Sequence, residues 1–65
     1  MVNEQPKVTP QARYNVSQTA ALLGMHRNTI TRKTEAGQLR CGYRKDTMAR
    51  FYKGAEIIRF WRQEM

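Results

Sequence analysis

Cysteine and long apolar runs are both scarce in this chain of 65 residues. Cys41 is the single cysteine, so no intrachain disulfide can form and packing alone must hold the fold, which fits a reducing compartment such as the cytoplasm. The longest apolar run has four residues, Ala20 to Leu23, whereas crossing a bilayer takes roughly 20. The N-terminal stretch also lacks the hydrophobic region of a signal peptide. We therefore expect a soluble cytoplasmic protein without a membrane partner.

Acidic and imidazole side chains are few as well, which limits the chemistry available. Five acidic residues and one histidine supply neither a pair of carboxylates nor a nucleophile beside a base, and no glycine loop could cradle a phosphate. A lone histidine and a lone cysteine cannot complete a tetrahedral metal site. The sequence therefore predicts no enzymatic activity, no catalytic residue, no metal and no cofactor.

Positive charge is what the chain has in excess. Twelve lysines and arginines against five acidic residues give a formal net charge of +7. The excess is concentrated between Arg27 and Lys53, where eight bases accompany only two acids, Glu35 and Asp46. Such a field favours a polyanionic partner, because a protein that neutralises phosphates releases condensed counterions. The alternative is a solvated basic surface that serves solubility alone.

The first part of the chain differs from the rest in its pattern. Residues 1–13 contain Pro6 and Pro10 and show no apolar periodicity, so they are predicted to form a flexible N-terminal arm. Residues 14–65 are then expected to form one domain, because a chain this short cannot divide its core.

The domain is predicted to begin with a short extended lead-in and a helix. Tyr14 and Val16 alternate with polar residues, which is typical of extended backbone. Ser17 is predicted to cap a helix over about residues 18–23, and Gly24 can adopt the left-handed conformation that ends it.

A second helix is predicted to start near His26 or Arg27 and to stop at Gly37. Ile30 and Thr34, four residues apart, share its inner face. The opposite face is polar at helical spacing and carries Arg27, Asn28, Thr31, Arg32 and Glu35.

A period of two follows the second helix and predicts a hairpin. Leu39, Cys41 and Tyr43 fall on one face of a half-buried strand, residues 45–47 form a polar turn, and residues 48–52 return as the partner strand. A last helix is expected from about residue 54 or 55 to residue 63, and its core spacing is given by Ile57, Phe60 and Trp61. The fold class is therefore mainly α with a small β-hairpin.

Two short helices joined by a glycine turn are typical of a helix-turn-helix, whose second helix enters the major groove of DNA. Arg27 and Arg32 can donate bidentate bonds to guanine, Asn28 can pair with adenine, and Thr31 can contact an acceptor or a thymine methyl group. Lys33 is expected either to contact the phosphate backbone or to be a plain solvated charge. Arg44 and Lys45 at the hairpin tip could reach the phosphate backbone or the adjacent minor groove, and Arg40 and Arg50 flank the hairpin. The alternative is a hairpin that only covers the core.

The stretch "YNVSQTAALLGMHRNTITRKTEAGQL" resembles the MerR-like winged-helix domains of phage and plasmid excisionases, which share a tyrosine lead-in, a capped helix, Leu-Gly, a basic helix and Gly-x-Leu. The segment "RFYKGAEIIRFW" resembles their final helix and also that of the DNA-binding domain of terminase small subunits. Where such relatives carry apolar residues late in the second helix, this chain has Lys33 and Thr34, which predicts a short or loosely anchored helix. Its wing also lacks the usual glycine and arginine cluster.

The resemblance implies a winged helix-turn-helix protein of a mobile element that binds double-stranded DNA and so associates with the nucleoid. Self-association along the DNA is possible, and an integrase or another mobile-element protein is a possible partner. Its role would be that of an excisionase-like recombination accessory factor or a small transcriptional regulator. A terminase small subunit domain is one alternative, and a basic module that docks on an acidic protein is another. RNA binding has less support, because the stacking aromatics of an exposed sheet are missing.

Overall fold

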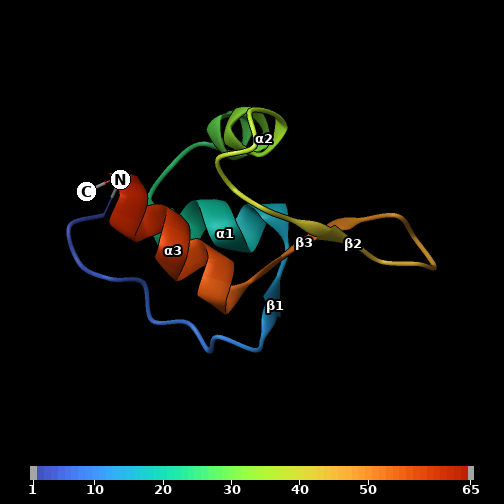
Figure 1. The fold of residues 1–65 in the computed structure, drawn as a ribbon, viewed down its shortest axis with the longest axis horizontal. Coiled ribbons are helices and arrows are strands. Elements are labelled where there is room, and N and C mark those ends of the chain that lie inside the picture. The colour runs from blue at the N-terminus through green and yellow to red at the C-terminus, as the bar shows by residue number, and fades with distance from the viewer. Residues whose placement is uncertain (1, 65) are drawn as a thin grey trace.

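Three helices and three short strands make up the computed structural model, which describes residues 2–64. Their order along the chain is β1 (Arg13–Tyr14), α1 (Val16–Leu23), α2 (Arg27–Glu35), β2 (Gly42–Tyr43), β3 (Arg50–Lys53) and α3 (Gly54–Glu64). The antiparallel sheet has the order β1-β3-β2 (Figure 1). This architecture confirms the predicted winged helix-turn-helix and adds one strand, since the extended lead-in pairs with β3 through Tyr14 and Tyr52.

The cap of α1 is one place where the prediction was wrong. Asn15, not Ser17, is the N-cap: its Oδ1 accepts the Gln18 amide at 2.7 Å, and Gln18 Oε1 accepts the Asn15 amide at 3.0 Å. The reciprocal pair is a capping box, which needs a long polar side chain three residues after the cap. Ser17 would have Ala20 in that position, and alanine has no group that could return the bond.

Both helices of the helix-turn-helix end at a left-handed glycine, as predicted. Gly24 has φ 66° and Gly37 has φ 80°. After α1, the Met25 amide donates to the Ala20 carbonyl and the Gly24 amide to the Ala21 carbonyl, which is the Schellman arrangement. The same two bonds recur after α2. The turn after Gly24 is thus fixed by local bonds, and it sets the direction in which α2 leaves α1.

The core lies where α1, α2 and α3 meet the sheet. Its fully buried large side chains include Leu23, Ile30, Tyr52, Ile57 and Phe60. At the end of α2, Thr34 Oγ1 donates to the Ile30 carbonyl at 2.8 Å and lies 2.7 Å from the Tyr52 hydroxyl. A hydrogen bond to β3 therefore anchors the part of α2 for which the sequence predicted loose packing.

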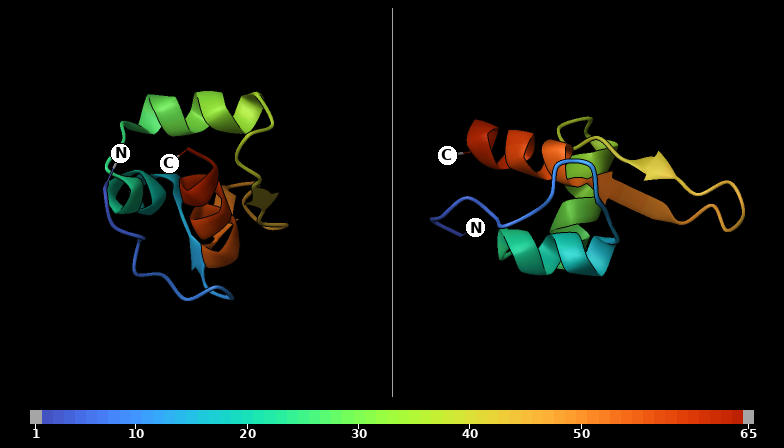
Figure 2. Two further views of the ribbon diagram at one scale, coloured as in Figure 1. Left: turned by 60° about the vertical axis from the view of Figure 1, so that its left-hand side comes forward. Right: turned by 90° about the horizontal axis from the view of Figure 1, so that it is seen from below.

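The segment expected to be a flexible arm lies against the body instead (Figures 1 and 2). Pro6 is buried and Val8 packs against the core. The Val2 amide donates to the Leu23 carbonyl at 3.0 Å, and Trp61 Nε1 donates to the Val2 carbonyl at 3.0 Å. These contacts use single apolar residues and backbone groups, so they leave no periodic pattern in the sequence.

The same segment also supplies the start of α3. The Gly54 amide donates to the Ala12 carbonyl at 3.0 Å, and the Ala55 amide donates to the Pro10 carbonyl at 3.1 Å. Two of the amides that a helix leaves unpaired at its first turn are satisfied in this way. We call residues 2–12 the N-terminal strap from here on.

The β2–β3 hairpin, residues 42–53, is the wing, and its tip projects beyond the helices (Figure 1; Figure 2, right). Its first strand is shorter than predicted: Leu39 is buried, Cys41 is half-buried, and Tyr43 in β2 is exposed. The predicted inner face therefore leaves the core as the hairpin extends. Across residues 2–64, none of the helices combines the length and the apolar character that spanning a bilayer requires.

Candidate nucleic-acid interface

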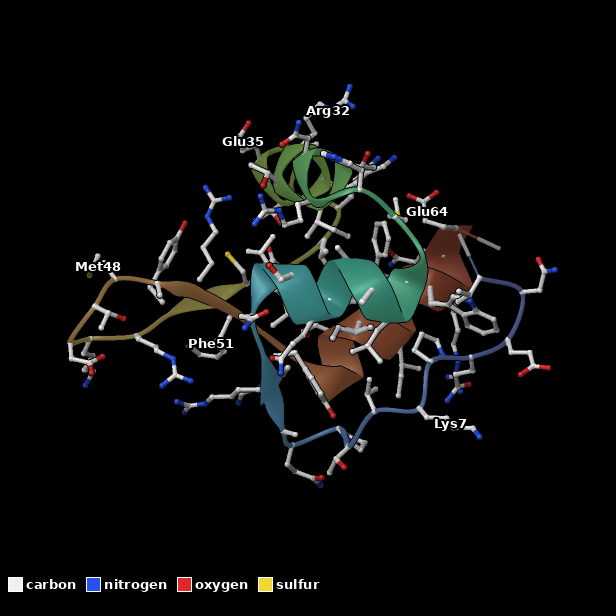
Figure 3. The ribbon with its side chains drawn as sticks, turned by 180° about the vertical axis from the view of Figure 1, so that it is seen from behind. Lys7, Arg32, Glu35, Met48, Phe51 and Glu64 are labelled. Atoms are coloured by element: carbon white, nitrogen blue, oxygen red, sulfur yellow. The ribbon has the colours of Figure 1, made fainter. Side chains whose placement is uncertain are left out.

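The outer face of α2 is set by how the helix starts and by what it buries. His26 is the N-cap, and its Nδ1 accepts the Asn28 amide at 3.1 Å. Ile30 faces inward and is 0% exposed. Because successive residues turn by about 100°, Arg27, Asn28 and Arg32 are directed outward, and all three are exposed. Figure 3 shows Arg32 on the side of α2 that points away from the body.

Two of the other predicted residues of α2 behave differently. Thr31 is half-buried at the margin of the outer face. Lys33 Nζ lies 3.5 Å from Glu64 Oε1, so it faces α3 rather than the outer side. Both partners are about one third exposed, and a pair of this kind contributes less than about 1 kcal/mol. It is the one ion pair within residues 2–64, so neither Arg27 nor Arg32 has an acidic partner there.

The wing presents Arg44 and Lys45 beside its turn, and both are exposed. The turn is closed by backbone bonds, from the Met48 amide to the Arg44 carbonyl at 2.8 Å and from the Arg44 amide to the Ala49 carbonyl at 2.9 Å. Asp46 Oδ1 accepts the Thr47 amide at 2.9 Å, so this carboxylate is engaged with the turn itself. The two basic side chains are left available for a partner.

Arg40 and Arg50 lie on opposite sides of the wing. Arg50 is paired with Tyr43 across the two strands, and the Tyr43 hydroxyl raises the pKa of the Arg50 guanidinium, mainly through a side-chain hydrogen bond. This side also carries Tyr52, which bonds to α2. Arg40 instead borders a hollow with Phe51, Lys53 and Glu56, on the side away from α2.

Arg13 has a structural contact that the sequence did not reveal. Its guanidinium carbon lies 4.6 Å from the centre of the Phe51 ring. The ring also lies directly over Gly42, where the Cβ of any other residue would overlap it. Phe51, labelled in Figure 3, therefore joins β1 to the wing. The contact depends on the long-range pairing of β1 with β3, for which the local pattern carries no signal.

The nine predicted residues thus divide into two groups. Seven of them lie on the outer face of α2 or on the wing. Those on α2 are Arg27, Asn28, Thr31 and Arg32. Those on the wing are Arg44 and Lys45 at its tip, and Arg50, which is paired with Tyr43. Lys33 and Arg40 are directed toward α3 and away from this surface. Contact of any of them with DNA remains a prediction.

A family model matches residues 11–36, and the family is described as bacterial regulatory protein, Fis family. The match begins just before β1, spans α1, the glycine turn and α2, and ends before the wing, so it covers less than half of the chain. No curated protein and no solved structure matches the chain significantly. Together with the observed geometry, the match defines a helix-turn-helix domain of the class that binds DNA in a sequence-specific way.

Proposed function

We propose that the chain binds duplex DNA with α2 in the major groove and reads bases through Arg27, Asn28, Thr31 and Arg32. The observation that carries this proposal is the exposure of three strong donors, Arg27, Asn28 and Arg32, on one face of α2. A guanidinium offers parallel donors that match guanine O6 and N7, and an amide matches adenine N6 and N7. The major groove is about 12 Å wide and admits one helix.

The wing supplies a second contact in this proposal. Arg44 and Lys45 would bind phosphates or the neighbouring minor groove, and Arg50 would add charge on the side that faces the same duplex. Phosphate contacts fix the orientation of the protein on DNA without selecting a sequence. Lys33 and Arg40, which face α3, would contribute through the general positive field.

The biological role we propose is that of an excisionase-like accessory factor for recombination or a small transcriptional regulator of a mobile element, working in the cytoplasm on nucleoid or element DNA. The resemblance to MerR-like excisionase domains supports it, and so does the winged architecture. The chain would perform no chemistry itself. It would act by occupying DNA, alone or in neighbouring copies, and an integrase is the partner that a recombination role requires. A terminase large-subunit gene beside this one would favour packaging instead.

Selection from a random duplex pool tests the proposal most simply. The protein is used to enrich duplexes, and an enriched duplex then competes with a scrambled duplex of the same length and composition for bound probe. We expect enrichment of a short motif and much stronger competition by the enriched duplex. Equal competition by both would show that charge alone is recognised, as expected for a basic module that docks on acidic proteins.

A further inference from the structure

The wing exposes large apolar side chains that do not pack against the hydrophobic core. Among residues 2–64, two large apolar side chains are exposed, Tyr43 at 52% and Met48 at 69%, and both are in the wing. Figure 3 shows Met48 near the end of the hairpin, away from the helices. Met48 is absent from the hydrophobic core and from the partly buried side chains that pack on it.

Met48 also has a backbone conformation that disfavours it. Its φ is 57°, the one positive φ of a non-glycine residue within residues 2–64. Residues with a Cβ are strained in this left-handed region, whereas glycine and, less completely, asparagine adopt it readily. A glycine would therefore suit the turn better. Neither packing nor the turn explains a methionine here, which points to a role in contact with another molecule.

The surroundings of Met48 select a polyanion rather than another protein. Arg44, Lys45 and Arg50 flank the tip, and Asp46, the nearby acid, is bonded to the turn. A protein-docking site usually gathers several apolar side chains into a patch, whereas the wing exposes two large ones, Tyr43 in β2, which is paired with Arg50, and Met48 at the turn of this narrow, basic hairpin.

We propose that Met48 is a wedge that enters a base-pair step from the minor groove and bends the duplex held by α2. This inference rests on the proposed function, since the duplex is its ligand. Apolar side chains such as methionine insert between base pairs in this way and kink DNA by roughly 20–90°. The flexible, polarisable thioether suits contact with the faces of the bases. Arg44 and Lys45 would hold the two phosphate backbones on either side of the opened step.

The experiment compares the full chain with three variants at this position. Met48→Gly and Met48→Asn remove the apolar side chain and relieve the strain, and Met48→Leu keeps an apolar side chain and the strain. The bend of an enriched duplex is measured by energy transfer between dyes at its ends. Thermal unfolding of each variant, measured in parallel, reports whether it is folded.

We expect the wild type and Met48→Leu to bring the ends of the duplex together, and Met48→Gly and Met48→Asn to bind the same duplex while losing most of that change. Both bend-deficient variants should unfold at or above the wild-type temperature, which separates loss of the wedge from loss of the fold. An unchanged bend with Met48→Gly, or an unbent duplex with the bound wild type, would overturn the wedge alone. Failure of the wild type to bind any duplex would overturn the proposed function as well.

Discussion

The turn between α1 and α2 and the turn at the wing tip use the same backbone conformation with different residues. Gly24 has φ 66° and Met48 has φ 57°. Glycine adopts this conformation freely, whereas a residue with a Cβ is destabilised by about 1–2 kcal/mol. The residue after Gly24, Met25, packs against the core, but Met48 is mostly exposed. One turn is therefore explained by folding, and the other is not.

The same contrast runs through the side chains of the two regions. In the body, the large apolar residues are buried and the polar bonds, such as Thr34 to Tyr52, tie elements together. On the wing tip and the outer face of α2, apolar and basic side chains are exposed and lack partners within residues 2–64. Stability thus accounts for the side chains of the body, and the proposed contact with DNA would account for those of the outer surface.

The largest effect should come from a matched pair of truncations, one in each region. Ile57→Ala removes a fully buried side chain and should lower the free energy of unfolding by about 2–5 kcal/mol. Met48→Ala should change it by less than about 0.5 kcal/mol, because the side chain is exposed. Denaturant unfolding of both variants measures the difference. Similar losses in the two variants would show that the wing tip belongs to the core.

Gly54→Ala tests whether the N-terminal strap belongs to the body. A Cβ at Gly54 would lie 2.7 Å from the Thr9 carbonyl carbon, so the substitution should destabilise the fold by about 1–3 kcal/mol. If the strap were a free arm, alanine would instead stabilise α3 by up to about 1 kcal/mol, since it is the better helix former. The sign of the change in thermal unfolding therefore distinguishes the two cases.

Arg32→Ala tests the reading role of the outer surface. We expect a loss of about 1–3 kcal/mol in binding an enriched duplex, together with relaxed selectivity at one base pair. Arg59 on α3 is also exposed and basic, so Arg59→Ala is the control for charge alone. The affinities are measured by fluorescence anisotropy on duplexes that differ at single positions. An equal loss of affinity for all of these duplexes would show that Arg32 contacts a phosphate rather than a base.

Lys45→Ala should have the smallest effect on binding, and it tests whether the wing contacts phosphates rather than bases. It should weaken binding to all duplexes alike and lower the slope of log affinity against log salt by about one. Titrations at several salt concentrations measure that slope. A change confined to one sequence would mean that Lys45 reads a base.

Local rules predicted much of the fold and part of the site. Gly24 and Gly37 end their helices where the pattern placed them, because a left-handed cap depends on a few neighbouring residues. The inward position of Ile30 follows from helical periodicity, and with it the outward direction of Arg27 and Arg32. The hairpin followed from its period of two and its polar turn.

The features that were missed depend on partners distant in sequence or on a choice between adjacent caps. The strap is held by bonds between Val2 and Leu23 and by the carbonyl groups that meet the first turn of α3. Lys33 turns toward Glu64, thirty-one positions later, and Arg40 lies beside Glu56 and Arg59 of α3. The cap of α1 is Asn15 rather than the predicted Ser17 because Gln18, three residues after Asn15, accepts the Asn15 amide through its Oε1.

Nuclear magnetic resonance titration of the labelled protein with an enriched duplex and a scrambled duplex tests the central claim most directly. The account predicts large shifts of the backbone and side-chain signals from Arg27 to Arg32 that differ between the two duplexes, with little change at Arg59 and Arg62 on α3. Signals from Arg27 to Arg32 that stay in place, while another surface responds, would contradict it.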